Sequence, residues 1–134
     1  MSPLNGNSRL VRSSEDVVSA RQLVREYAIS AGFSLVDQTK ILTAVSELAR
    51  NTVIYGGGGT MTVEALNQSM RRGVRVVFED HGPGIADIGE ALRDGFTTGN
   101  GLGLGLGGAK RLSNEFDIQS EPGKGTRITI TRWK

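Results

Sequence analysis

The sequence predicts an α+β fold, a two-layer sandwich in which helices cover one face of a mixed, mostly antiparallel sheet. Three observations support this prediction. Two segments with helical periodicity follow a short first strand, β-branched segments with a period of two dominate the rest, and glycine-rich turns separate them. A chain of 134 residues can form one hydrophobic core, so we expect a single domain over residues 1–134.

The first strand and the first helix are predicted from an alternating segment and a capping signal. Arg9–Arg12 alternates polar and apolar residues, which is typical of an edge strand. Ser13 precedes Asp16 by three positions, as at a helix start, and we expect the helix to continue to about Ala31. Gly32 suits the left-handed position that follows a last helical turn.

The second helix begins with the same signal, because Ser34 precedes Asp37 by three positions. We expect it to end near Tyr55, since the run Gly56–Gly59 disfavours a helix. The remaining predicted elements are strands at Thr60–Leu66 and Val74–Glu79 joined near Asn67–Gly73, helices at Asp87–Arg93 and Ala109–Asn114, and strands at Phe116–Ser120 and Arg127–Arg132 joined by a turn at Glu121–Gly125.

Composition argues against several classes of function. The chain has no cysteine and one histidine, His81, so neither a thiolate site nor a histidine cluster can bind a metal. Its 16 basic residues are interleaved with 14 acidic ones, and we expect no nucleic-acid binding. Met1–Asn7 lacks the apolar core of a signal peptide, and no apolar run is long enough to span a bilayer. We therefore expect a cytoplasmic protein without membrane contact.

Glu47 and Asn51 are the first candidate site residues. They lie four positions apart on one side of the second predicted helix, beside the apolar stripe that contains Val45 and Leu48. Such a flank can face a pocket between helix and sheet. An acid and a carboxamide there offer the hard oxygen ligands that Mg²⁺ prefers. Taken alone, the pair also fits an ordinary solvated helix surface.

Asp80 follows a predicted strand and begins a turn with the sequence Asp-His-Gly-Pro-Gly. An ionised carboxylate only accepts hydrogen bonds, so it suits the exocyclic amine of adenine. Gly82 and Gly84 would let a flat ring approach the main chain, because no Cβ intervenes. A plain loop of turn-forming residues explains the segment equally well.

The glycine-rich run at 99–108 alternates glycine and leucine at positions 101–106. Alternate glycines leave backbone N–H groups free to face phosphate, and the following helix would add its positive N-terminal end. A flexible loop is the plainer alternative. The run is not a P-loop, which requires Gly-Lys before Ser or Thr, and it is not a dinucleotide fingerprint, which must follow a strand.

The segment Gly123-Lys124-Gly125-Thr126 is the fourth candidate. Thr126 begins the last predicted strand, where its hydroxyl could reach a bound base. In isolation this hairpin needs no function.

In this order and spacing, the four pieces resemble the nucleotide-binding domain shared by gyrase, Hsp90, sensor histidine kinases and MutL proteins. In that family Glu-x-x-x-Asn is the N box, Asp-x-Gly-x-Gly the adenine box, Gly-x-Gly-x-Gly the lid and Gly-x-Gly-Thr the last glycine box. Residues 44–51 (Ala-Val-Ser-Glu-Leu-Ala-Arg-Asn), with Asp37-Gln38 before them, and residues 94–98 (Asp-Gly-Phe-Thr-Thr) are similar to the small anti-sigma-factor-type serine/threonine kinases, above all the stressosome switch kinases. The implied fold is the Bergerat-type ATP-binding sandwich.

The resemblance implies a kinase that phosphorylates STAS-domain partners with Mg-ATP and switches partners in bacterial stress or sigma-factor signalling. It implies that Glu47 is the general base and that Asn51 binds Mg²⁺. No cation for the γ-phosphate is assigned, and Arg50 is a candidate. The residues implied to bind nucleotide are Asn51, Asp80, Gly82, Gly84, Ile85, Thr98, Gly101, Leu102, Gly103, Leu104, Gly105, Leu106 and Thr126.

Two alternatives stay open at this point. One is a non-catalytic, ATP-dependent module that docks and activates a phosphatase of the PP2C type. The other is an anti-sigma factor that binds a sigma factor directly.

Overall fold

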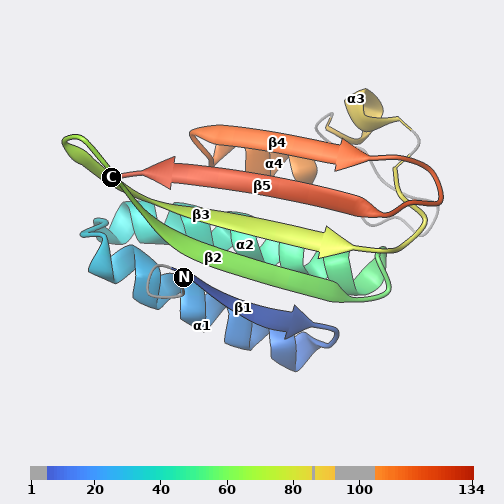
Figure 1. Ribbon diagram of the computed structural model, residues 1–134, viewed down its shortest axis with the longest axis horizontal. Helices are drawn as coiled ribbons and strands as arrows, with labels where there is room; N and C mark the ends of the chain where they lie inside the picture. Colours follow the sequence, from blue (N-terminus) through green and yellow to red (C-terminus); the bar gives the residue numbers. More distant parts are fainter. Residues whose placement is uncertain (1–5, 86, 93–104) are drawn as a thin grey trace.

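The computed structural model describes residues 6–85, 87–92 and 105–134, which form one sheet with helices packed on one of its faces (Figure 1). This is the predicted α+β sandwich. The elements in chain order are β1 (Gly6–Val11), α1 (Ser14–Ser30), α2 (Leu35–Ile54), β2 (Gly59–Gln68), β3 (Arg71–Asp80), α3 (Ile88–Ala91), α4 (Leu106–Arg111), β4 (Glu115–Ser120) and β5 (Thr126–Trp133).

The five strands are arranged in the order β1-β2-β3-β5-β4, and every pair of neighbours is antiparallel. The prediction of a mixed sheet is therefore wrong for the described strands, while β1 is an edge strand as predicted. The loop predicted at Asn67–Gly73 is mostly strand, and the turn between β2 and β3 contains only Ser69 and Met70. Polar residues such as Asn67 and Arg72 are paired in the ladder, which an apolar alternation pattern cannot reveal.

Both predicted helix starts are confirmed. The hydroxyl of Ser13 accepts a hydrogen bond from the N–H of Asp16 at 3.2 Å, and that of Ser34 accepts one from the N–H of Asp37 at 3.1 Å. Gly32 has φ +85° after α1. The two later helices differ from the prediction, since α3 covers only four residues and α4 begins at Leu106, before the glycine pair at 107–108.

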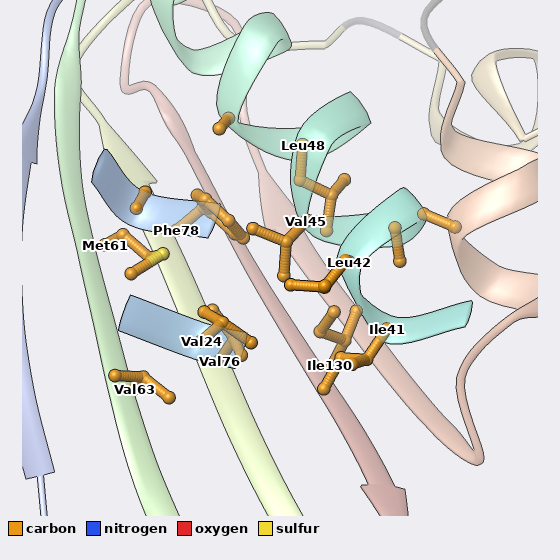
Figure 2. Close-up of a cluster of buried hydrophobic side chains, with 14 of the residues drawn as sticks. Val24, Ile41, Leu42, Val45, Leu48, Met61, Val63, Val76, Phe78 and Ile130 are labelled. Atoms are coloured by element: carbon orange, nitrogen blue, oxygen red, sulfur yellow. The ribbon is translucent and has the colours of Figure 1, made fainter. Parts of the chain in front are cut away.

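The core lies between the helices and one face of the sheet. In Figure 2, Ile41, Val45 and Leu48 of α2 face the side chains of the strands. The buried strand residues alternate along the chain, so that the opposite sheet face carries mostly polar side chains, such as Glu64, Arg75 and Thr129. The strand residues at this interface include Met61, Val63, Val76, Phe78 and Ile130, which are all fully or almost fully buried.

One end of the sheet collects the segments that the sequence marked as functional, on the right in Figure 1. There β3 ends at Asp80, β4 ends at Ser120 and β5 begins at Thr126. The glycines that follow α2 reach the same place, because Gly56 packs on Asp80. The β2–β3 turn lies at the opposite end.

An ion pair links that opposite end to the start of α2. Nη2 of Arg132 donates to Oδ1 of Asp37 at 2.8 Å. This hydrogen bond is the main reason that the pKa of Asp37 lies below its ordinary value of 3.8.

We expect Asp37→Asn to lower the free energy of unfolding at neutral pH, and to matter less as the pH falls. Because the folded-state pKa is the lower one, the stabilisation is complete above the unfolded pKa of about 4 and is lost as the pH falls through the folded pKa. Urea titrations of both proteins between about pH 7 and about pH 3 measure the difference. Asp117→Asn, on the exposed side of β4, is the control. A difference that did not change with pH would contradict the prediction.

Candidate functional site

Asp80 is the centre of the candidate site, since three other segments contact it. Its Oδ1 accepts a hydrogen bond from the N–H of Gly82 at 2.9 Å. A Cβ added at Gly56 would lie 2.5 Å from Cγ of Asp80. A Cβ added at Gly125 would overlap the carbonyl oxygen of Asp80. Thr126 pairs with Asp80 across the sheet. The turn after β3, the glycines that follow α2 and the last hairpin thus meet at Asp80, the first two at its carboxylate and the hairpin at its backbone.

The glycines of the Asp80 turn are needed for backbone contacts. A Cβ at Gly82 would lie 2.7 Å from Cα of Gly56. Gly84 has φ +78°, and a Cβ there would overlap the carbonyl oxygen of Glu121. Any side chain at these positions would push the turn away from its neighbours. This close packing is a reason for both glycines that is independent of a bound ring.

Ser120 joins the turn to the last hairpin, a contact that the sequence did not predict. Its Oγ accepts from the N–H of Ile85 at 2.8 Å and donates to the carbonyl of Gly125 at 3.0 Å. It also lies 2.8 Å from Oγ1 of Thr126. Since a serine hydroxyl carries one proton, Thr126 is the donor in that contact and keeps its lone pairs for another partner. Two predicted nucleotide residues, Ile85 and Thr126, are therefore held by one hydroxyl.

Glu47, on α2, is the second residue around which the candidate site is built. Its Oε1 lies 3.3 Å from Nη1 of Arg50, and its side chain is about one-third exposed, at 36%. Its Oε2 faces the start of α4, where a Cβ added at Gly105 would lie only 2.5 Å away. Gly105 has φ +68°, and the next residue, Leu106, is buried. The carboxylate of Glu47 thus contacts the C-terminal end of the predicted lid.

Asn51 lies one helical turn after Glu47 on the same side of α2. Its backbone carbonyl accepts hydrogen bonds from the N–H groups of Tyr55 and Gly56 at 2.9 and 3.1 Å. These bonds direct the chain from α2 towards Asp80. Within the described ranges, no three His, Cys, Asp or Glu side chains form a metal-binding group.

The predicted lid lies largely outside the described residues. Thr98, Gly101, Leu102, Gly103 and Leu104 belong to the segment 93–104 that the structure does not describe. Only Gly105 and Leu106 can be placed, beside Glu47 and in the core.

A cleft of about 560 Å³ borders the same loops. Its volume falls in the range of small-molecule sites. Its lining includes Asp80, Ser120 and Thr126, with Ile88 of α3 and Lys124 of the last hairpin.

Comparisons with known proteins identify the family of the chain. Residues 36–134 match the family described as "Histidine kinase-, DNA gyrase B-, and HSP90-like ATPase". The chain belongs to this ATPase family. It is 48% identical to "Serine/threonine-protein kinase RsbT" of Bacillus subtilis over 118 residues, which cover 88% of this chain and 89% of the relative. It is 31% identical to "Anti-sigma F factor" of a Thermoanaerobacter species over 120 residues, 85% of this chain and 82% of the relative.

Two solved structures share the fold. The RsbU and RsbW domains of a Mycobacterium tuberculosis protein give a TM-score of 0.67 at 21% identity, covering 96% of this chain and 33% of that one. The catalytic domain of the histidine kinase ThkA gives 0.53 at 14% identity, covering 94% and 95%. Family and fold are thus confirmed, and the relatives support ATP-dependent protein kinase activity. No helix within the described ranges is both long and apolar enough to span a membrane.

Gly56 and Ser120 are the residues of this site that the sequence interpretation missed. The sequence predicts the run Gly56–Gly59 only as a helix end. One glycine suffices to end a helix, so four in succession indicate that a further structural constraint, such as a close backbone contact, requires glycine here. Ser120 carried no local signal, because its role depends on contacts with Ile85 and Thr126.

We expect Gly125→Ala to weaken nucleotide binding and stability more than Gly123→Ala does. Both glycines have positive φ, +84° and +79°, so each variant incurs a backbone cost of about 1–2 kcal/mol. Only the Cβ at position 125 would overlap the carbonyl of Asp80. Around position 123, no described atom lies within 4 Å of the added Cβ. Titration with a fluorescent ATP analogue and thermal unfolding measure the two effects, and equal losses in both variants would contradict the expectation.

Proposed function

We propose that this protein is a serine/threonine kinase that transfers the γ-phosphoryl group of Mg-ATP to a hydroxyl of a STAS-domain partner. The observation that carries the proposal is the position of Glu47. Its carboxylate contacts the end of the lid at Gly105 and lies one turn from Asn51. A carboxylate between the lid and a metal ligand is where a base for the incoming hydroxyl is needed.

The sheet end around Asp80 is proposed to bind adenine. Oδ1 of Asp80 accepts from the N–H of Gly82, and the other carboxylate oxygen is proposed to accept from the adenine amine. Thr126 keeps lone pairs for the same base, and Ile85 supplies apolar contact. Gly82 and Gly84 are proposed to admit the ring beside the main chain.

The triphosphate is proposed to lie between the sheet end around Asp80 and α2. Asn51 would bind Mg²⁺ through its side-chain oxygen, and the ion would neutralise phosphate charge. Gly105 and Leu106 would close the site. The residues proposed to wrap the phosphates beyond the described segment are Thr98, Gly101, Leu102, Gly103 and Leu104.

In the transfer step, Glu47 is proposed to accept the proton of the partner's hydroxyl as its oxygen bonds to the γ-phosphorus and ADP leaves. The ion pair with Arg50 would hold the carboxylate in place, and the guanidinium would lie beside the charge that builds up on the phosphoryl group. Such transfer depends mainly on positioning and charge neutralisation.

Partner switching is the proposed biological role, in the cytoplasm of a bacterium under stress or sigma-factor control. The support is the similarity to proteins named for a serine/threonine kinase and for anti-sigma factors. A phosphatase of the PP2C type or a sigma factor is the proposed alternative partner, bound without phosphorylation.

We expect Glu47→Gln to lower the rate of partner phosphorylation by about 100-fold or more and to leave the affinity for ATP unchanged. The amide has the same size, but it cannot accept the proton. Transfer of label from ATP to a STAS-domain protein measures the activity. Glu64→Gln, on the polar face of the sheet, is the control. Undiminished labelling would remove Glu47 from the mechanism, and partner capture without any labelling in the wild type would favour the binding module.

We expect Asp80→Asn to weaken ATP binding by about tenfold or more, since a hydrogen bond to a charged acceptor is lost. The amide can donate to the O6 of guanine, so the preference for ATP over GTP should shrink. Competition titrations with both nucleotides measure this preference. Glu64→Gln, on the polar sheet face and outside the cleft at Asp80, should leave it unchanged. A preserved preference in Asp80→Asn would place adenine elsewhere.

A further inference from the structure

Arg132 of β5 connects the two helices that form the Glu47 side of the site. Its Nη2 donates to Oδ1 of Asp37 in the first turn of α2, at 2.8 Å. Its Nη1 donates to the carbonyl of Leu112 at the C-terminal end of α4, also at 2.8 Å. One guanidinium fork thus joins α2, α4 and the sheet, which a single ammonium group cannot do with the same geometry.

This contact is not explained by stability alone. The Arg132 side chain is only 14% exposed, and its Nε donates to no acceptor within the described part of the chain. A buried N–H without a partner and a cation removed from water both cost free energy. A partly buried ion pair of this kind is weak evidence for stabilisation, and its clearest effect is to fix geometry.

The Arg132 contact fixes the packing of α4 against α2, the helix that carries Glu47. Helices α2 and α4 pack against each other and run in opposite directions, since Asp37 and Leu112 meet at one end and Glu47 and Gly105 at the other. A helix of six residues is about 9 Å long, so the Arg132 contact lies about that far from the end of the lid. A shift of α4 at Leu112 would therefore also change the position of Gly105 relative to Glu47.

The chain on the C-terminal side of α4 has further anchors on the same strand. The N–H of Asn114 donates to the carbonyl of Thr131 at 2.8 Å. The N–H of Trp133 donates to Oδ1 of Asn114 at 2.6 Å. These bonds hold the turn after α4, whereas Arg132 is the contact that reaches from the strand to both helices.

We propose that Arg132 is a positioning residue for the phosphoryl-transfer site: by tying Asp37 to the Leu112 carbonyl, it sets the place of α4, and so of Gly105, relative to Glu47. The proposal rests on the function proposed for Glu47 and the lid. Arg132 touches neither nucleotide nor partner in this account, and it acts through α4.

The test compares Arg132→Met, which removes both hydrogen bonds, with Arg132→Lys, which keeps the charge. Arg75→Met is the matched control, because Arg75 is also a strand arginine that contacts a carboxylate and a β5 oxygen, on the other sheet face. Three quantities are measured: amide exchange at Ala109 and Leu112, whose N–H groups form the hydrogen bonds of α4, the affinity for Mg-ATP, and the single-turnover rate of partner phosphorylation.

We expect Arg132→Met to speed exchange in α4 but not in the middle of α2, and to lower the transfer rate by about tenfold or more. Arg132→Lys should be intermediate, and Arg75→Met should match the wild type. A merely structural role would speed exchange throughout the chain and would leave affinity and rate per folded molecule unchanged. If Arg132→Met does not fold, Asp37→Asn provides the same measurements with one bond weakened.

Unchanged α4 exchange and unchanged transfer in Arg132→Met would overturn the positioning role while leaving the proposed kinase activity intact. If instead the wild type transfers no phosphoryl group, the proposed function fails. Faster α4 exchange together with weaker Mg-ATP binding in Arg132→Met would then still support the link between Arg132 and the lid.

Discussion

The site depends on the close approach of three backbone segments around one residue, Asp80. Gly56, Gly82 and Gly125 come so near to Asp80, or to one another, that a single methyl group at any of them would overlap a neighbour. These contacts hold the end of α2 and the last hairpin against the end of β3. They add to the core packing that sets the distance between Asp80 and the helix that carries Glu47.

The residues of the site therefore come from two rigid parts of the fold rather than from one motif. We call these parts the sheet frame and the helical frame. The sheet end supplies Asp80 and Thr126 through ladder and turn hydrogen bonds, whose geometry is set by the pairing of β3 with β5. The helical frame supplies Glu47 from α2 and Gly105 from α4. Each frame is rigid for a different reason, the sheet through its hydrogen bonds and the helices through buried side chains such as Leu48 and Leu106.

The sequence predicted what is local and missed what is not. The caps at Ser13 and Ser34 were predictable, because the capping side chain and the N–H that it accepts from are three residues apart. The four motifs were predictable as residues, but their meeting was known only through the family resemblance. Ser120 and Arg132 were missed for a physical reason: their partners lie far away in the chain, and a serine before a turn or an arginine in a strand carries no local pattern.

The two-residue turn at Ser69 and Met70 has a practical consequence. It lies at the end of the sheet opposite Asp80, and the Met70 side chain is 98% exposed. The sequence contains no cysteine. A cysteine introduced at this turn would therefore be the only thiol in the chain. A dye or a surface tether attached to it would lie at the end of the sheet opposite the candidate site.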